Sequence, residues 1–242
     1  MLRVLTYNIH HGADGRGRLD LARIADTIAG CEPDIVALQE VDRRWGSRSD
    51  GEDQPRWLGD RLGMTVHFAA NVVPAPRQPT VPSAGYGLAL LSRWSLSAVT
   101  HHTYSVPADA RGERRGFLEG TVYCDRAGGS ASALRVVNTH LSAVGGRFRR
   151  AQVQELLDHV GPARLPTVVA GDFNAGPRSR AVRQLRVRYQ DAWRAGSGAG
   201  ATIRGRRIDY LWVSAQLRPV RTWVVRSSAS DHLPVVSDLE RS

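Results

Sequence analysis

The chain has 242 residues, of which 42% are hydrophobic, an ordinary fraction for a folded protein. Such a chain can bury a large core, and we expect a single domain over residues 1–242. It has no apolar run of about 20 residues, which excludes an ordinary membrane-spanning helix. The first predicted strand begins at Leu2 and leaves no room for a signal peptide, so we expect a cytoplasmic protein or a mature form that has lost its signal. Its two cysteines, Cys31 and Cys124, are too few for a disulfide framework and are expected to be reduced.

The formal net charge is +10, and every one of the 33 basic residues is arginine. A GC-rich coding bias that puts arginine on solvated surfaces would explain this composition. Selection for an anionic substrate would explain it as well, because a positive rim attracts negative charge. The arginines gather in three groups, at residues 147–150, 178–188 and 204–207. The first two groups follow candidate site residues, so the charge indicates the sign of a substrate and not its identity.

Six short apolar segments, rich in β-branched residues, have the length and pattern of buried strands. In chain order they cover residues 3–10, 34–40, 87–93, 135–140, 167–174 and 207–214. They form one set of three that occurs twice. The first two segments of each half end in Asn, Gln, Glu, Asp or His. Because polar residues gathered where strands end build a site, we expect two related layers that meet at a shared cleft.

Between the first and second segments of each half, apolar residues recur at helical spacing. They predict a helix over 19–30 with Asp20 as its N-cap, and another over 152–160. Polar, proline-rich or small residues predict the connections, which are loops over 43–54 and 72–85, a turn near 127–133 and a flexible segment over 196–200.

The polar residues after these strands suit the hydrolysis of a phosphate ester. That reaction needs a divalent cation, an activated water, and positive or hydrogen-bonding groups near the developing charge. Carboxylate and amide oxygens suit Mg²⁺, and imidazoles can hold or protonate phosphate oxygens. The candidates are Glu40, Asp172, Asp209, Asp231, Asn8, Asn174, His140 and His232.

Several other enzyme classes are disfavoured. The chain has neither a thiolate cluster nor a His-Glu-x-x-His helix, which argues against a zinc protease. A P-loop NTPase needs a lysine that this chain lacks. The Gly-x-Ser-x-Gly turn of many serine hydrolases is also missing.

Six motifs together resemble the endonuclease/exonuclease/phosphatase superfamily, also called deoxyribonuclease I-like. They are Tyr7-Asn8-Ile9-His10, Leu38-Gln39-Glu40-Val41, Asn138-Thr139-His140-Leu141, Gly171-Asp172-Phe173-Asn174-Ala175, Arg207-Ile208-Asp209-Tyr210 and Ser230-Asp231-His232-Leu233-Pro234. They occur in the family's order and extend from the first strand to the last. The resemblance implies a four-layer α/β sandwich, in which two mixed β-sheets pack face to face with helices outside. The chain looks most like the compact bacterial branch of metal-dependent hydrolases.

The resemblance also implies how the metal and the attacking water are held. Glu40 would be the chief ligand of Mg²⁺ or Mn²⁺, with Asn8 near the metal or the scissile phosphate and Asp231 near the metal. Asp172 would orient or deprotonate the attacking water. Asn174 would hold that water or a phosphate oxygen.

The remaining implied roles concern the phosphate. His232, oriented by Asp209, would stabilise the charge of the phosphorane-like state, and His140 would contact the phosphate from the other side. Arg115 falls where related sequences carry an arginine, which implies a phosphate contact. His10 aligns with a position where some relatives have a metal-binding carboxylate, and its role stays open.

We therefore expect a divalent-metal-dependent phosphodiesterase that is a monomer, acts on an anionic phosphate ester and has no protein partner. Two departures from the family bear on the substrate: no lysine follows Leu38-Gln39-Glu40, and Gly87-Leu88 stands where many relatives have Gly-Asn. Three alternatives stay open. They are a DNA or RNA nuclease, a sphingomyelinase-like lipid phosphodiesterase or small-molecule phosphatase, and a non-catalytic binding module, which the complete set of site residues disfavours.

Overall fold

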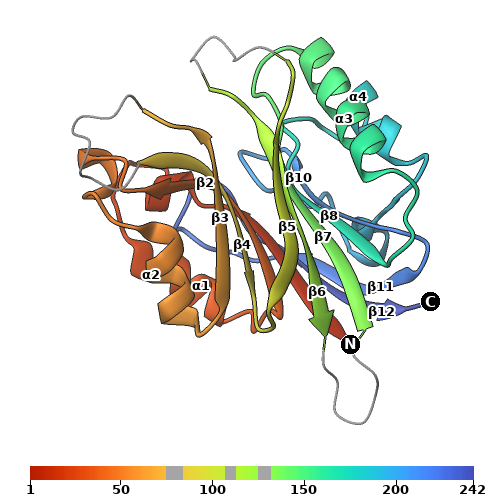
Figure 1. The fold of residues 1–242 in the computed structure, drawn as a ribbon, viewed down its shortest axis with the longest axis horizontal. Helices are drawn as coiled ribbons and strands as arrows, with labels where there is room; N and C mark the ends of the chain where they lie inside the picture. Colours follow the sequence, from red (N-terminus) through yellow and green to blue (C-terminus); the bar gives the residue numbers. More distant parts are fainter. Residues whose placement is uncertain (75–83, 107–112, 125–131) are drawn as a thin grey trace.

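Two six-stranded mixed β-sheets form the centre of the molecule (Figure 1). The computed structural model describes residues 1–74, 84–106, 113–124 and 132–242. The first sheet has the order β11-β12-β1-β2-β4-β3, and the second has the order β5-β6-β7-β8-β10-β9. The strands of the first sheet are β1 (Leu2–Asn8), β2 (Ile35–Arg43), β3 (Thr65–Val72), β4 (Gly85–Ser92), β11 (Leu217–Val224) and β12 (Val235–Arg241). Those of the second are β5 (Leu96–Thr103), β6 (Gly116–Cys124), β7 (Ser132–His140), β8 (Thr167–Asp172), β9 (Gln190–Asp191) and β10 (Asp209–Val213).

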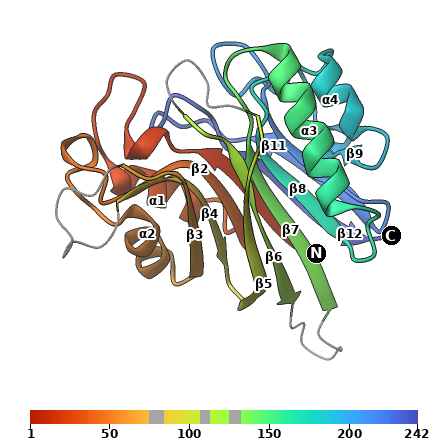
Figure 2. The same ribbon diagram turned by 45° about the horizontal axis from the view of Figure 1, so that its top comes forward.

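Helices cover the outer face of each sheet (Figure 2). The α-helices are α1 (Leu21–Ala29), α2 (Gln54–Leu62), α3 (Gly146–Val160) and α4 (Arg180–Leu185), and the short 3₁₀ turns are η1 (His10–Gly12), η2 (Ser47–Ser49) and η3 (Ala192–Ala195). α1 and α2 lie against the first sheet, and α3 and α4 lie against the second (Figure 1). No helix in the described ranges is long and apolar enough to cross a membrane.

Three buried apolar clusters hold these layers together. The central cluster joins the facing sides of the two sheets and includes Val4 of β1 and Val136 of β7. A second cluster packs Ile24 of α1 on the first sheet, and a third packs Val153 of α3 on the second. The protein is therefore the four-layer α/β sandwich that the resemblance implies.

The repeated set of three segments is confirmed by strand pairing. β1 and β2 are parallel and β4 is antiparallel to β2, while β7 and β8 are parallel and β10 is antiparallel to β8. α1 connects β1 to β2, and α3 connects β7 to β8. Because the two strands of each pair are parallel, both end at the same edge of their sheet.

Both predicted helices are confirmed, α3 with a different start, and two helices, α2 and α4, were not predicted. Asp20 caps α1, because its carboxylate accepts a hydrogen bond from the Arg23 backbone N–H at 3.0 Å. α3 begins at Gly146 rather than at residue 152, since its first turn carries arginines and lacks the apolar spacing that marks the rest. α2 directly follows the predicted loop over 43–54 and was not predicted. The loop over 72–85 and the turn near 127–133 fall largely outside the described residues.

Gly171 permits the close approach of β8 to β7. Its φ is +144°, and a Cβ atom there would lie 1.9 Å from the Thr139 carbonyl oxygen. No side chain fits at that distance, so a larger residue must push the two central strands apart.

We expect Gly171→Ala to lower the free energy of unfolding by at least about 1–3 kcal/mol, the usual cost of overpacking a core. Urea denaturation followed by circular dichroism measures the change. Gly146→Ala is the matched control, because a Cβ atom at Gly146 meets no atom within 4 Å. Equal stability of the two variants would show that β8 can shift without cost.

Candidate active site

The site residues predicted from the sequence lie together at one edge of the sandwich. Asn8 ends β1, Glu40 lies in β2, His140 ends β7, Asp172 ends β8, Asp209 begins β10, and Asp231 and His232 lie between β11 and β12. Asn8 joins the two sheets, because its Nδ2 donates to Glu40 Oε1 and to Asp172 Oδ2, each at 3.1 Å. Segments from both halves of the chain therefore build one site.

Asp172 is the buried centre of the group. Its Oδ1 accepts a hydrogen bond from the Asn174 backbone N–H at 2.8 Å, and its Oδ2 lies 3.4 Å from His140 Nε2 and 3.9 Å from His232 Nε2. Burial alone would raise the pKa of Asp172, but its contacts with His140, His232 and the Asn174 N–H hold that pKa well below its usual value. The side chain is therefore an ionised carboxylate that accepts hydrogen bonds.

His232 and Asp209 form a buried pair beside Asp172. His232 Nδ1 lies 3.0 Å from Asp209 Oδ2, so the ring proton on Nδ1 is donated to the carboxylate. Burial alone would lower the pKa of His232, but the nearby carboxylates of Asp209 and Asp172 raise it to about 10. At neutral pH the ring is therefore an imidazolium, and its Nε2–H faces the rest of the site.

Arg115 fixes the orientation of His140. Both side chains are buried, and Arg115 Nη1 lies 2.9 Å from His140 Nδ1. Because a guanidinium can only donate, Nδ1 must accept, and this assigns the ring proton to Nε2 on the side of Asp172. Arg115 also pairs with Glu113. The structure thus places Arg115 behind His140, and direct contact with a phosphate stays a prediction.

Asn174 lies next to His140 in the turn after β8. Its Nδ2 donates to the Leu141 carbonyl oxygen at 3.0 Å and lies 3.1 Å from His140 Nε2. Its φ of +48° is in the left-handed region, which asparagine tolerates better than most residues. The backbone turn at Asn174 is what allows its own N–H to reach Asp172.

A β-bulge turns Glu40 toward the site. The pairing of β2 with β4 shifts between Gln39 and Val41, and the intervening Glu40 has a φ of +56°. Burial alone would raise the pKa of Glu40, but His140, the Asn8 amide and Arg115 lower it overall. The strained backbone holds an ionised carboxylate at a place that regular pairing would not give.

His10 and His11 follow β1 directly and lie beside Glu40. One nitrogen of each ring and one Glu40 oxygen all lie within 4.8 Å of one another. His10 Nδ1 is also 3.9 Å from Asp231 Oδ1. The structure therefore places His10 beside Glu40. It also places His11, for which the sequence analysis predicted no role, in the same cluster.

Two of the predicted arginine groups also reach this edge. Arg149 at the start of α3 donates from Nη1 to the carbonyl oxygens of Ser142 and Ala143 at 3.0 and 3.1 Å. Burial and the nearby Arg206 lower the pKa of Arg149, while Asp172 acts in the opposite direction. Arg149 is therefore close enough to Arg206 and to Asp172 for its charge to interact with both.

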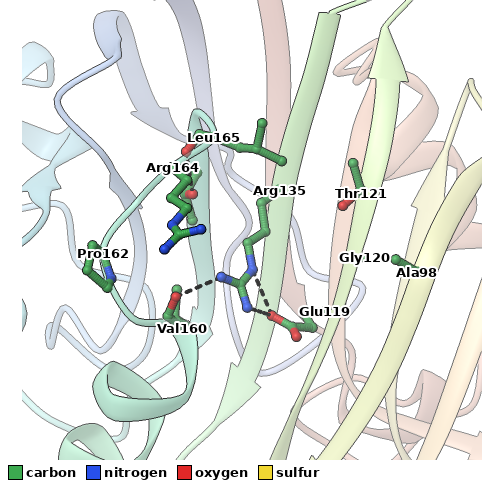
Figure 3. A pocket seen from close by; sticks show the side chains of 10 residues that line it. Ala98, Glu119, Gly120, Thr121, Arg135, Val160, Pro162, Arg164 and Leu165 are labelled. Atoms are coloured by element: carbon green, nitrogen blue, oxygen red, sulfur yellow. Dashed lines mark hydrogen bonds and ion pairs between the residues drawn. The ribbon is translucent and has the colours of Figure 1, made fainter.

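A pocket of about 380 Å³ lies away from this site, on the outer face of the second sheet (Figure 3). It is lined by Glu119 of β6 and Arg135 of β7, among others. Arg135 is paired with Glu119 and donates to the Val160 carbonyl oxygen at 2.8 Å. Because Arg135 and Glu119 are paired with each other and none of the predicted site residues lines this pocket, the strand edge is the better candidate for the active site.

The chain belongs to the Endonuclease/Exonuclease/phosphatase family, whose model matches residues 5–232. A crystal structure of an endonuclease/exonuclease/phosphatase from Beutenbergia cavernae is 30% identical, with a TM-score of 0.80 over 100% of this chain and 72% of that one. The human Nocturnin catalytic domain with bound sulfate is 24% identical, with a TM-score of 0.73 over 100% and 94% of the two chains. A mannosyl-6-phosphatase from Bacteroides thetaiotaomicron is 19% identical, with a TM-score of 0.77 over 99% and 100%. No curated protein matches the sequence.

The His232–Asp209 pair gives a spectroscopic prediction. In metal-free protein, both ring nitrogens of His232 should be protonated at neutral pH, and the ring should lose a proton at a pH of about 10. Asp209→Asn removes the adjacent negative charge, so this titration should move to lower pH. Nitrogen-15 NMR of the histidine rings measures it. Asp238→Asn is the control, because Asp238 pairs with Arg3 rather than with His232; an unmoved titration in Asp209→Asn would show that Asp209 does not hold the proton.

Proposed function

We propose that this protein is a divalent-metal-dependent phosphodiesterase that hydrolyses its substrate by in-line attack of water. The observation that carries the proposal is the ionised Asp172 of the second sheet, which contacts Asn8 and His232 from the first sheet and His140 from its own sheet. An anion buried in this way stays ionised and accepts hydrogen bonds, so it can orient an attacking water. Family members act on phosphate esters, and the phosphatase among the structural neighbours supports the same class of reaction here.

The residues beside Glu40 fit a divalent cation. Glu40 offers a carboxylate at the bulge, Asp231 offers another beside His10, and hard cations prefer such oxygens. When bound, Mg²⁺ or Mn²⁺ would supply Lewis-acid stabilisation of the phosphate charge. Asn8 holds the Glu40 and Asp172 carboxylates in place through Nδ2, and its Oδ1 accepts the His10 N–H at 3.1 Å. Ligation of the metal by Asn8 stays a prediction.

The other residues have complementary tasks. Asp172 would orient or deprotonate the attacking water, while Asn174 would hold the water or a phosphate oxygen. His232, whose Nδ1 is bound to Asp209, has its Nε2–H available to stabilise the negative charge that develops on the phosphate. His140 carries its proton on Nε2 and would donate from the second sheet.

A nuclease is the second candidate, and the placement of Arg149 favours it. The charge of Arg149 interacts with that of Asp172, and Arg206 lies near Arg149, so the two arginines could contact phosphates that flank the scissile one. A small diester with one negative charge would need neither arginine. Binding of a polyanion releases counterions, so its affinity should fall steeply with added salt.

Catalysis should depend on the two central carboxylates. We expect Glu40→Gln and Asp172→Asn each to lower kcat/KM for bis-p-nitrophenyl phosphate with Mg²⁺ or Mn²⁺ by at least about 100-fold, and EDTA to stop the reaction. Glu240→Gln is the matched control, since Glu240 pairs with Arg218. A correctly folded Glu40→Gln variant with full activity would refute the proposed site, and a wild-type protein that cleaves no phosphate ester would leave a binding module as the better description.

Arg149→Ala should separate the two substrate classes. If the protein is a nuclease, this variant should lose plasmid nicking by about tenfold or more and keep its activity on bis-p-nitrophenyl phosphate, because only the polyanion contacts the arginine. Arg241→Ala is the control, since Arg241 lies at the opposite end of β12 from the site. Parallel assays with p-nitrophenyl phosphate and sphingomyelin complete the comparison, and turnover of a small ester or lipid with intact plasmid would reject the nuclease.

A further inference from the structure

Two adjacent histidines give the candidate metal site nitrogen as well as oxygen donors. His10 and His11 form the turn η1 directly after β1, and each presents a ring nitrogen within 4.8 Å of the other and of a Glu40 oxygen. The two rings lie 4.4 Å apart between centroids and are tilted by 60°. With this tilt the rings are not stacked face to face, and one nitrogen of each remains close to the same Glu40 oxygen.

His10 has a buried atom that lacks a hydrogen bond. Among the residues that the structure describes, Nδ1 of His10 has no hydrogen-bond partner, although it is shielded from solvent. The nearest carboxylate oxygen, Asp231 Oδ1, is 3.9 Å away, which is too far for a hydrogen bond. A buried polar atom without a partner is costly, and a bound ion would satisfy this nitrogen.

The position of His11 is fixed by a buried glutamine from another element. Gln54 at the start of α2 donates from Nε2 to the His11 carbonyl oxygen at 2.7 Å, and its Oε1 accepts the Asp42 backbone N–H at 3.0 Å. One side chain thereby ties η1 to β2 just beyond Glu40. The closeness of the histidines to Glu40 is therefore built into the fold rather than left to a free loop.

We propose that His10 and His11 bind the divalent ion together with Glu40, as a site of two histidines and one carboxylate with Asp231 beside it. This inference rests on the metal dependence of the proposed function and specifies which of Mn²⁺ and Mg²⁺ the site prefers. Imidazole nitrogens suit transition metals, whereas Mg²⁺ strongly prefers oxygen ligands. The site should therefore bind Mn²⁺ in preference to Mg²⁺.

The direct test is Mn²⁺ binding to the full chain. Electron spin echo envelope modulation should show nitrogen couplings from two imidazoles in the wild type and from one in His10→Ala or His11→Ala. Calorimetry should show that each substitution weakens Mn²⁺ binding by at least about tenfold and affects Mg²⁺ binding less, so that the preference for Mn²⁺ falls. His67→Ala is the control, because His67 lies in β3 away from this cluster.

The contrary outcomes separate this inference from the proposed function. If Mn²⁺ binds the wild type with no nitrogen coupling and Glu40→Gln abolishes binding, the ion is held by oxygens and the histidine site is wrong, while the phosphoesterase stands. If neither Mn²⁺ nor Mg²⁺ binds, both are wrong. The wild-type spectrum decides the matter even if a histidine variant fails to fold.

Discussion

The buried charge of Asp172 is the constraint on which the site depends. A carboxylate taken out of water must be compensated by donors, and the loss of one partner of a buried charge typically costs about 3–5 kcal/mol. Here the donors come from both sheets, with Asn8 on β1, and the Asn174 N–H and His140 at the ends of β8 and β7. Of these donors, Asn8 comes from the facing sheet, so separation or sliding of the sheets would take one hydrogen bond from a buried anion. The geometry of the site therefore depends on the packing of the two sheets.

The two halves of the chain have the same topology but have diverged in what their polar residues do. Asn8 is the last residue of β1 and reaches the site, whereas Asn138 lies before the end of β7 and stays between the sheets. Asn138 donates to the carbonyl oxygens of Leu38 and Ala89 at 2.7 and 2.9 Å and accepts from Gln39. Asn8, at the end of its strand, therefore contacts the carboxylates of the site. Asn138, two residues before the end of the matching strand, contacts backbone carbonyl groups of the facing sheet instead.

The strand pattern predicted two related layers with a site where they meet, and the family resemblance added the four-layer sandwich. Polar residues after buried strands had to meet once the two parallel pairs ended at one edge, and the cap at Asp20 followed from local chemistry alone. The contributions of His11 and Gln54 were not predictable in this way. Gln54 binds His11 across 43 residues of chain, and neither position belongs to a strand whose pattern could place it. The bulge at Glu40 likewise depends on pairing with β4 and leaves no local signal.

The structure also divides the arginines into different classes, which composition alone could not do. Arg3, Arg135 and Arg207 form ion pairs with Asp238, Glu119 and Asp191, so carboxylates of the protein already neutralise their charges. Arg149 instead uses one guanidinium nitrogen on backbone carbonyls and keeps its charge within range of Asp172. A coding bias can supply arginines of both kinds, and only the second kind can act on a substrate. The net charge of +10 is therefore a poor guide to the ligand, and the few cations held at the strand edge determine what the site attracts.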